Sequence, residues 1–406
     1  MRFSILQASG LFALAVRAVP APQAVTTTES NAMSATGTPG RIPSGNPPQP
    51  SNAYPNTGNL TQPEPMPYMP AGGVNTNKSS IPVYQAFSDF DWQSLSLALY
   101  QEWIELDLFQ AGLDMFSDED FNKTGIGAEN RALIAYMSQQ EIGHATLISN
   151  MLGPHAPKRC QYQYPFKTVP EFIDFCQKLT RWGEAGVYGF LPHMDSRPAA
   201  QMLLQSITTE ARQQMIFRQL EGLFPTPEWF QIGVPQSFAW TLLAPYIKSC
   251  PADTPKLPWQ NFPALNVTNN PQAYDPAFQA ALTHNRTQLS HPGREVNFTF
   301  SDAGDHVGPN NSYVTRTFAG KPAFAAWISQ LNVTYTPLYN VNTTDNNGTH
   351  SASAVQPDGH LYSNLNPLVN GTVFVVLTDT DLYVTPHNVS LLLPHVVAGP
   401  DVYMAG

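Results

Sequence analysis

A carboxylate and an imidazole lie one helical turn apart in the stretch SQQEIGHATL, as Glu141 and His144. Residues three apart on an α-helix lie on the same face. Because Ile134, Met137 and Ile148 follow the same helical spacing, this face is predicted to pack against other helices. A Glu-x-x-His pair that faces the interior can bind a metal ion, whereas the same pair on a solvated face usually forms only an ion pair.

Further acids favour the interior site, because every predicted long helix carries one inward-facing carboxylate. The runs and their acids are 89–113 with Glu102, 127–152 with Glu141, 169–192 with Glu184, and 197–222 with Glu210. Each acid lies near the middle of its run, on a stripe of residues that recurs at heptad-like intervals. If the runs pack side by side, the acids meet in one layer.

Carboxylates gathered in a dry layer repel one another and raise their own pKa values unless a positive charge lies among them. Metal ions are the usual source of that charge, and we predict iron or manganese. In a ferritin-like site two helices each supply a Glu and the other two each supply a Glu-x-x-His pair. Glu102 and Glu184 match the single acids, and Glu141 with His144 matches one pair.

The last long helix departs from this pattern, because TTEARQQ has Gln213 where the second His is expected. A carboxamide oxygen is neutral and binds iron, manganese or zinc more weakly than imidazole does. The sequence therefore predicts one strong and one weak metal position. The predicted ligands are Glu102, Glu141, His144, Glu184, Glu210 and Gln213.

Two alternatives stay open. The layer is either a metal centre or a metal-free polar layer that protons or the nearby Arg181 and Arg212 neutralise. Glu105 either supports the ligands from beside them or replaces one of them. His155 and His193 lie at helix ends and are expected at the surface.

The connections between the helical runs favour a bundle with one long crossover. A helix of about 24 residues is ~36 Å long, and residues 153–168, when extended, reach ~50 Å. That segment can cross the whole bundle, whereas residues 193–196 can only turn back. The order of short, long and short links is the one that a ferritin-like four-helix bundle requires. A shorter helix is expected at 236–248.

The sequence after residue 250 changes to short β-prone runs separated by Pro, Asn and Thr. These runs are 296–300, 313–318, 333–339, 373–377 and 389–393. They predict an antiparallel β-rich module, such as a small sandwich. The fold class is therefore α+β, with a helical bundle at 81–250 and a β-rich module at 251–406.

The N-terminal sequence predicts secretion. Residues 1–18 have the basic start, short apolar run and small-residue end of a signal peptide. Residues 19–80 are rich in Pro, Ser, Thr and Asn and are expected to form a disordered leader. N-x-S/T sequons are frequent, mostly after residue 260, so we expect the β-rich module to be glycosylated. Cys160, Cys176 and Cys250 allow one disulfide and one free thiol.

The bulk composition excludes two classes of partner. The net charge of −10, from 20 basic and 30 acidic residues, gives no basic surface for nucleic acid. The sequence contains no apolar run of the ~18 residues that a membrane span needs. Metal ions, and for a secreted chain components of the cell wall, are the expected partners.

Several phrases resemble a known family. These are ALYQEWIELDLF, QQEIGHATLI, RWGEAGVYGFL and TTEARQQMIFR, followed by TVFVVLTDTDLYVTP and LPHVVAGP. They are similar to the fungal secreted ferritin-like family that includes stress-response and late sexual development proteins. The resemblance implies a ferritin-like bundle, an extracellular or cell-wall location and a role in stress or development, without an established reaction.

Two functions follow as hypotheses. The first is a secreted protein that binds iron or manganese in the bundle; as an enzyme it would be a di-metal oxidoreductase of ferroxidase or manganese-catalase type. The second is a non-catalytic, glycosylated cell-surface or cell-wall protein with a metal-free ferritin-like scaffold. A monooxygenase-type or desaturase-like oxidase using the same layer is a third possibility.

Overall fold

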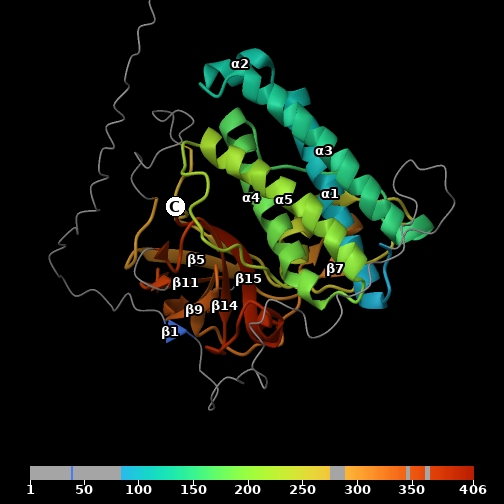
Figure 1. The fold of residues 1–406 in the computed structure, drawn as a ribbon. Coiled ribbons are helices and arrows are strands. Elements are labelled where there is room, and N and C mark those ends of the chain that lie inside the picture. The colour runs from blue at the N-terminus through green and yellow to red at the C-terminus, as the bar shows by residue number, and fades with distance from the viewer. Residues whose placement is uncertain (1–37, 40–83, 275–288, 344–347, 362–365) are drawn as a thin grey trace, which may run out of the picture. The chain divides into compact units, whose positions relative to one another are not determined.

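Four long helices lie alongside one another in the computed structural model, each starting at or next to the predicted residue (Figure 1). They are α1 Asp89–Met115, α3 Ala128–Leu152, α4 Val169–Phe190 and α5 Arg197–Leu220. The short helix α2 Asp118–Lys123 lies between α1 and α3 in the chain, and α6 Gln236–Leu243 follows the bundle. The predicted four-helix bundle is therefore confirmed.

The structure describes residues 38–39, 84–274, 289–343, 348–361 and 366–406. These residues belong to one compact unit. The expected signal peptide at 1–18 and leader at 19–80 lie outside the described residues, apart from Thr38–Pro39. No described helix has the length and apolar character that a membrane crossing requires.

Local sequence signals set the starts of the helices. The Ser88 hydroxyl accepts a hydrogen bond from the Asp91 N–H at the start of α1, which satisfies an N–H group that has no partner within the helix. Thr168 and Glu171 form a reciprocal capping box at α4, and Ser196 caps α5. These caps coincide with the predicted breaks between the runs.

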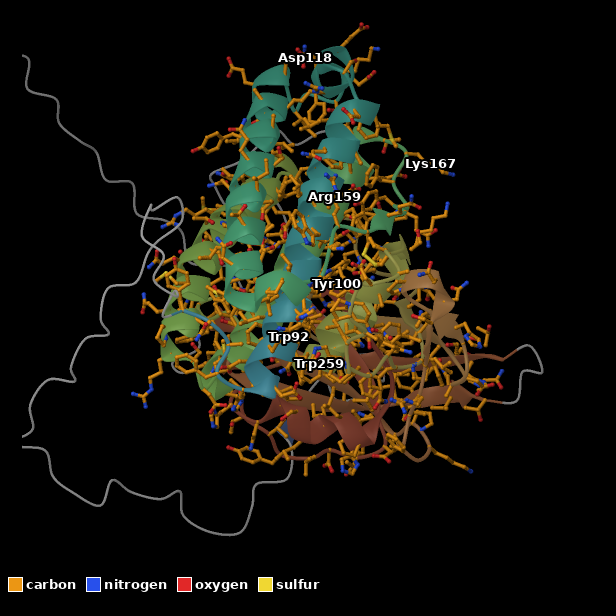
Figure 2. All side chains as sticks on the ribbon, turned by 90° about the vertical axis from the view of Figure 1, so that its right-hand side faces the viewer. Trp92, Tyr100, Asp118, Arg159, Lys167 and Trp259 are labelled. Carbon is orange, nitrogen blue, oxygen red and sulfur yellow. A yellow bond between two sulfur atoms is a disulfide. The ribbon has the colours of Figure 1, made fainter. Side chains whose placement is uncertain are left out.

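The long link between α3 and α4 runs back along the bundle. Figure 2 shows Arg159 beside the middle of the helices and Lys167 nearer the end marked by Asp118. Arg159 donates hydrogen bonds to Asp107 of α1 at 2.7 Å and to Gln110 at 2.9 Å. These contacts fix the crossing segment against α1, as the single-crossover topology requires.

A disulfide ties the crossing segment to the chain beyond α6. It joins Cys160 to Cys250, which leaves Cys176 as a buried free thiol in α4. Next to it, β2 (Gln161–Tyr162) pairs with β3 (Ile247–Ser249). The pairing left open by the sequence is thus resolved within the described residues.

Two antiparallel sheets form the C-terminal part. The first has the order β1-β9-β8-β14-β15 and the second β10-β11-β5-β4. The first sheet contains β1 Thr38–Pro39, β9 Asn332–Pro337, β8 Phe324–Ser329, β14 Thr372–Thr378 and β15 Val396–Met404. The second contains β10 Tyr339–Asn342, β11 Thr349–Val355, β5 Glu295–Ser301 and β4 Leu265–Val267. The predicted antiparallel, strand-rich module is confirmed.

Short elements complete the described chain. The remaining strands are β6 His306–Val307, β7 Tyr313–Val314, β12 His360–Leu361 and β13 Asn366–Pro367. The 3-10 turns are η1 Gly153–His155, η2 Leu191–His193, η3 Ala244–Tyr246, η4 Pro309–Asn311 and η5 Val389–His395. The strand predicted at 389–393 is wrong: η5 contains Pro394, and its buried side chains, Val389 and Leu392, are three residues apart, which is the period of a 3-10 helix.

Strand β14, which lies between β8 and β15 in the first sheet, packs against both the helices and the second sheet. Its side chains alternate between the two faces of the sheet. Phe374 and Val376 join the core shared with the helices, whereas Val373 and Val375 join the core between the two sheets. The domain boundary predicted at residue 250 stays a prediction, because β2 and β3 precede it and the helices share one core with the first sheet.

Candidate metal centre

Three of the long helices bring an imidazole and three carboxylates together inside the bundle. Glu102 comes from α1, Glu141 and His144 from α3, and Glu210 from α5. One ligand atom from each residue lies within 4.8 Å of every other. All three carboxylates are at most 2% exposed, and the His144 side chain is 11% exposed. We call these residues the carboxylate–histidine cluster.

His144 lies at the centre of this cluster. Its Nδ1 atom is 3.0 Å from Glu141 Oε2, 3.3 Å from Glu102 Oε2 and 3.6 Å from Glu210 Oε1. A single ring nitrogen thus faces all three acids. The layer predicted from the helical spacing exists for these four residues.

The other ring nitrogen of His144 is held by Thr209, which precedes Glu210 on α5. Thr209 Oγ1 lies 3.0 Å from His144 Nε2 and 2.7 Å from the Ser206 carbonyl. A hydroxyl has one proton to donate. Because that proton goes to the carbonyl, Thr209 accepts a hydrogen bond from Nε2–H. When His144 is neutral, as a metal ligand must be, its proton therefore stays on Nε2 and the lone pair of Nδ1 is free for an ion.

Burial and mutual repulsion set the electrostatics of the cluster. Burial raises the pKa of Glu102 to about 7, although the neighbouring His144 opposes this rise. Burial, with Glu102, Glu105 and Glu141 nearby, holds the pKa of Glu210 well above its usual range. For His144, burial lowers the pKa, but Glu102 and Glu141 outweigh it and raise the pKa to about 12. The site strongly favours a positive charge among its acids.

Gln213 lies beside the cluster as a hydrogen-bond donor. Its Nε2 donates to Glu141 Oε1 at 2.5 Å and to Gln140 Oε1 at 3.2 Å. In this arrangement the amide N–H points to the carboxylate and orients Glu141, while the buried Gln213 Oε1 has no hydrogen-bond partner among the described residues. The helical position that was predicted as a weak ligand thus supports a strong one.

Glu184 lies outside the carboxylate–histidine cluster. Its Oε2 is 3.8 Å from Arg181 Nη1, one turn earlier on α4, and both side chains are buried. Arg181 in turn contacts β14, where its guanidinium lies 5.3 Å from the centre of the Phe374 ring and its Nε donates to the Thr372 carbonyl at 3.3 Å. The predicted ligand is therefore paired with an arginine that faces the sheet.

Glu105 occupies the level next to the cluster, one turn after Gln101 and Glu102 on α1. Thr180 of α4 donates a hydrogen bond to it, and Gln101 Nε2 donates another at 3.3 Å. Burial, with Glu141 and Glu102 nearby, raises its pKa well above the usual range. Helix α4 thus contributes the Thr180 hydroxyl beside the cluster. The sequence signal for this residue was a polar side chain on the inward-facing side of α4.

Comparison with known proteins agrees with this architecture. Residues 90–223 match the family model of the ferritin-like domain. The chain is also 56% identical over 369 residues to Protein rds1 of Schizosaccharomyces pombe. The alignment covers 87% of this chain and 90% of that protein. The chain belongs to this fungal ferritin-like family. The matched segment of the ferritin-like domain contains the whole carboxylate–histidine cluster.

The residues of this ferritin-like protein fit one metal ion. Glu210 Oε2 and Glu102 Oε2 are buried without a hydrogen-bond partner among the described residues, and Glu102 Oε2 lies 3.3 Å from His144 Nδ1. A buried carboxylate oxygen without partners is costly, and a cation would satisfy it. Three carboxylates and one imidazole form a donor set that iron, manganese and zinc accept.

Proposed function

We propose that this fungal ferritin-like protein binds one iron or manganese ion through Glu102, Glu141, His144 and Glu210. The observation that carries the proposal is the convergence of these four buried side chains, with ligand atoms within 4.8 Å of one another. Such a group concentrates negative charge in a place from which water is largely excluded. A cation bound there opposes the burial and the mutual repulsion that raise the carboxylate pKa values.

The surrounding residues prepare the cluster for an ion. Thr209 keeps the Nε2 proton of His144 in place, so that Nδ1 is the ligand atom. Gln213 fixes one oxygen of Glu141 by its hydrogen bond and leaves the other beside His144. Iron or manganese would supply Lewis-acid and one-electron redox chemistry when bound.

The arrangement supports one ion and not two. A second ion would need donors from Glu184 or Glu105, but Glu184 lies outside the group of converging ligand atoms, 3.8 Å from the buried Arg181, and Glu105 accepts hydrogen bonds from Thr180 and Gln101. Ferroxidase and manganese-catalase types of reaction use a pair of metal ions. We therefore infer metal binding without the di-metal turnover of those enzymes.

Metal titration tests this proposal. The full-length protein is freed of metal with a chelator and titrated anaerobically with Fe²⁺ and with Mn²⁺. We expect one ion per chain in the wild type and loss of binding in Glu141→Gln. Glu184→Gln is the matched control, because it changes another buried carboxylate of the bundle and should keep the ion. Equal binding by wild type and Glu141→Gln, or no binding by either, would refute the proposal.

A metal-free scaffold is the second candidate, and one observation favours it. The Nδ1 atom of His144 lies within 3.6 Å of all three acids of the cluster, so a protonated imidazole neutralises part of their charge. This candidate predicts a folded protein without metal whose melting temperature does not change on addition of Fe²⁺, Mn²⁺ or chelator. The metal-binding proposal predicts a higher melting temperature with the bound ion.

We propose further that the protein is secreted, glycosylated and associated with the cell wall. The signal-like N-terminus supports this, as do the sequons and the Cys160–Cys250 disulfide, because disulfides persist mainly in oxidising compartments. Fractionation of a fungal culture, with glycosidase treatment of the recovered protein, tests it. Recovery only from the cytosol, without a glycosidase shift, would contradict secretion.

The resemblance noted above also supports a role in nutrient stress or sexual development. A deletion strain tests that role. We expect reduced survival of starvation or reduced spore formation, restored by the wild-type gene. Normal survival and sporulation of the deletion strain would contradict it.

A further inference from the structure

Two histidines from distant parts of the chain meet at the surface, away from the carboxylate–histidine cluster. His193 lies in η2 at the end of α4, and His387 lies in the loop before η5. Their ring centroids are 4.8 Å apart, with 37° between the ring planes. Both side chains are exposed, so ions from solution can reach them.

The histidine pair borders a cavity of about 310 Å³. The walls of the cavity come from α1, the end of α4, the segment before α6 and the loop around His387. They include Phe90, Gln236 and Ser390. A volume of this order is at the lower end of small-ligand pockets.

Close backbone packing keeps one wall of this cavity in place. A Cβ atom added to Gly189 would lie 1.9 Å from the Val234 carbonyl oxygen, and one added to Gly233 would lie 2.4 Å from the Gly189 nitrogen. The Val234 N–H also donates to the Ala185 carbonyl at 2.8 Å. The helix that leads into His193 is therefore fixed against the segment before α6.

The separation of the two rings matches that of imidazoles bound to one metal ion. Metal–nitrogen distances of about 2.0–2.1 Å and a nitrogen–metal–nitrogen angle of about 90–110° place two ring centroids about 4.5–5.2 Å apart. The observed 4.8 Å lies within this interval. Imidazole nitrogen is a preferred ligand of copper, zinc and nickel.

We propose that His193 and His387 form a binding site for a divalent late transition-metal ion, with Cu²⁺ the tightest binder and Zn²⁺ the next candidate. Two protein ligands leave the remaining coordination positions open to water or to a small ligand in the adjoining cavity. The ion would also link the end of the bundle to the C-terminal β-rich part, since the two histidines belong to these two parts.

The alternative is that the two rings only stack on each other and bind no ion. Aromatic rings also stack at centroid separations of about 4.5–7 Å, and the pair at 4.8 Å falls in that range. Stacking alone and metal binding make opposite predictions for the same variants, so one set of titrations separates them.

The test is a titration of the chelator-treated, full-length protein with Cu²⁺ and with Zn²⁺. We expect His193→Ala and His387→Ala each to weaken one binding event at least tenfold, and the second substitution in the double variant to add a smaller loss than the first. His155→Ala, which removes another exposed histidine, should bind as the wild type does. Superhyperfine splitting from two nitrogens in the Cu²⁺ EPR spectrum should be lost in both single variants.

His144→Ala distinguishes this site from the carboxylate–histidine cluster. It should leave the two-nitrogen Cu²⁺ signal in place whether or not the cluster binds metal. His193→Gln and His387→Gln provide folded replacements if either alanine variant is unstable, and circular dichroism checks the fold. Identical Cu²⁺ and Zn²⁺ isotherms for the wild type and for both His193 and His387 variants would overturn the proposal and leave only a stacked pair.

Discussion

Replacing Thr209 by Val removes one hydroxyl beside His144 at nearly constant volume. In the wild type that oxygen accepts the Nε2–H of His144 at 3.0 Å while its own proton goes to the Ser206 carbonyl. Loss of the acceptor leaves a largely buried donor without a partner, which costs about 1–3 kcal/mol. Loss of a residue that orients a ligating histidine typically lowers metal affinity by about 10- to 100-fold, or ~1.4–2.8 kcal/mol.

Titration of the chelator-treated protein with Mn²⁺ measures the change in affinity. We expect Thr209→Val to bind Mn²⁺ at least tenfold more weakly and Thr209→Ser to recover most of the loss. Thr208→Val is the control, because Thr208 is exposed and donates to the Gln205 carbonyl in the same way. Wild-type affinity in a folded Thr209→Val protein would refute the role assigned to Thr209.

Two further predictions concern α4. Burial holds the pKa of Glu184 at about 8 against an ordinary 4.5, so the folded state binds more protons than the unfolded state between these values, and stability falls as pH rises from about 5 to 8. The loss in the free energy of unfolding is at most about 5 kcal/mol. Urea unfolding of the metal-free protein measures it, and Glu184→Gln should lose less stability over this pH range than the wild type. Glu119→Gln, which alters an exposed acid, should lose as much as the wild type. Gly189→Ala should destabilise the fold by about 1–3 kcal/mol, because the new Cβ would lie 1.9 Å from the Val234 oxygen. In the control Gly143→Ala the new Cβ meets nothing within 4 Å, so this substitution should stabilise α3 by up to about 1 kcal/mol. An unchanged pH profile in Glu184→Gln, or equal effects of the two glycine substitutions, would contradict these assignments.

The helices could be predicted closely because their signals are local. Helices α1, α4 and α5 start where the sequence predicted, next to the capping residues Ser88, Thr168 and Ser196. The spacing of apolar residues shows which face of each helix turns inward. Strand order could not be predicted, because β14 pairs with β8 and β15, which lie far from one another in the sequence. The run 389–393 contains the residue types of a strand but pairs with no strand in the part of the chain that the structure describes.

The cluster was predictable in part for the same reason. Helical spacing places Glu102, Glu141 and Glu210 inward and at the same height, which is sufficient to bring them together. It does not say which buried acid meets an arginine, and the pairing of Glu184 with Arg181 depends on where β14 lies. The approach of His387 to His193 likewise depends on how a loop of the β-rich part folds back.

Anomalous diffraction from crystals grown with iron or manganese tests the central claim most directly. Difference maps calculated from data at the Fe or Mn absorption edge should show one peak per chain, bounded by Glu102, Glu141, His144 Nδ1 and Glu210. The same maps from Glu141→Gln crystals should lack it. No peak in the bundle, or a pair of peaks that includes Glu184 as a ligand, would contradict a single-ion site at this cluster.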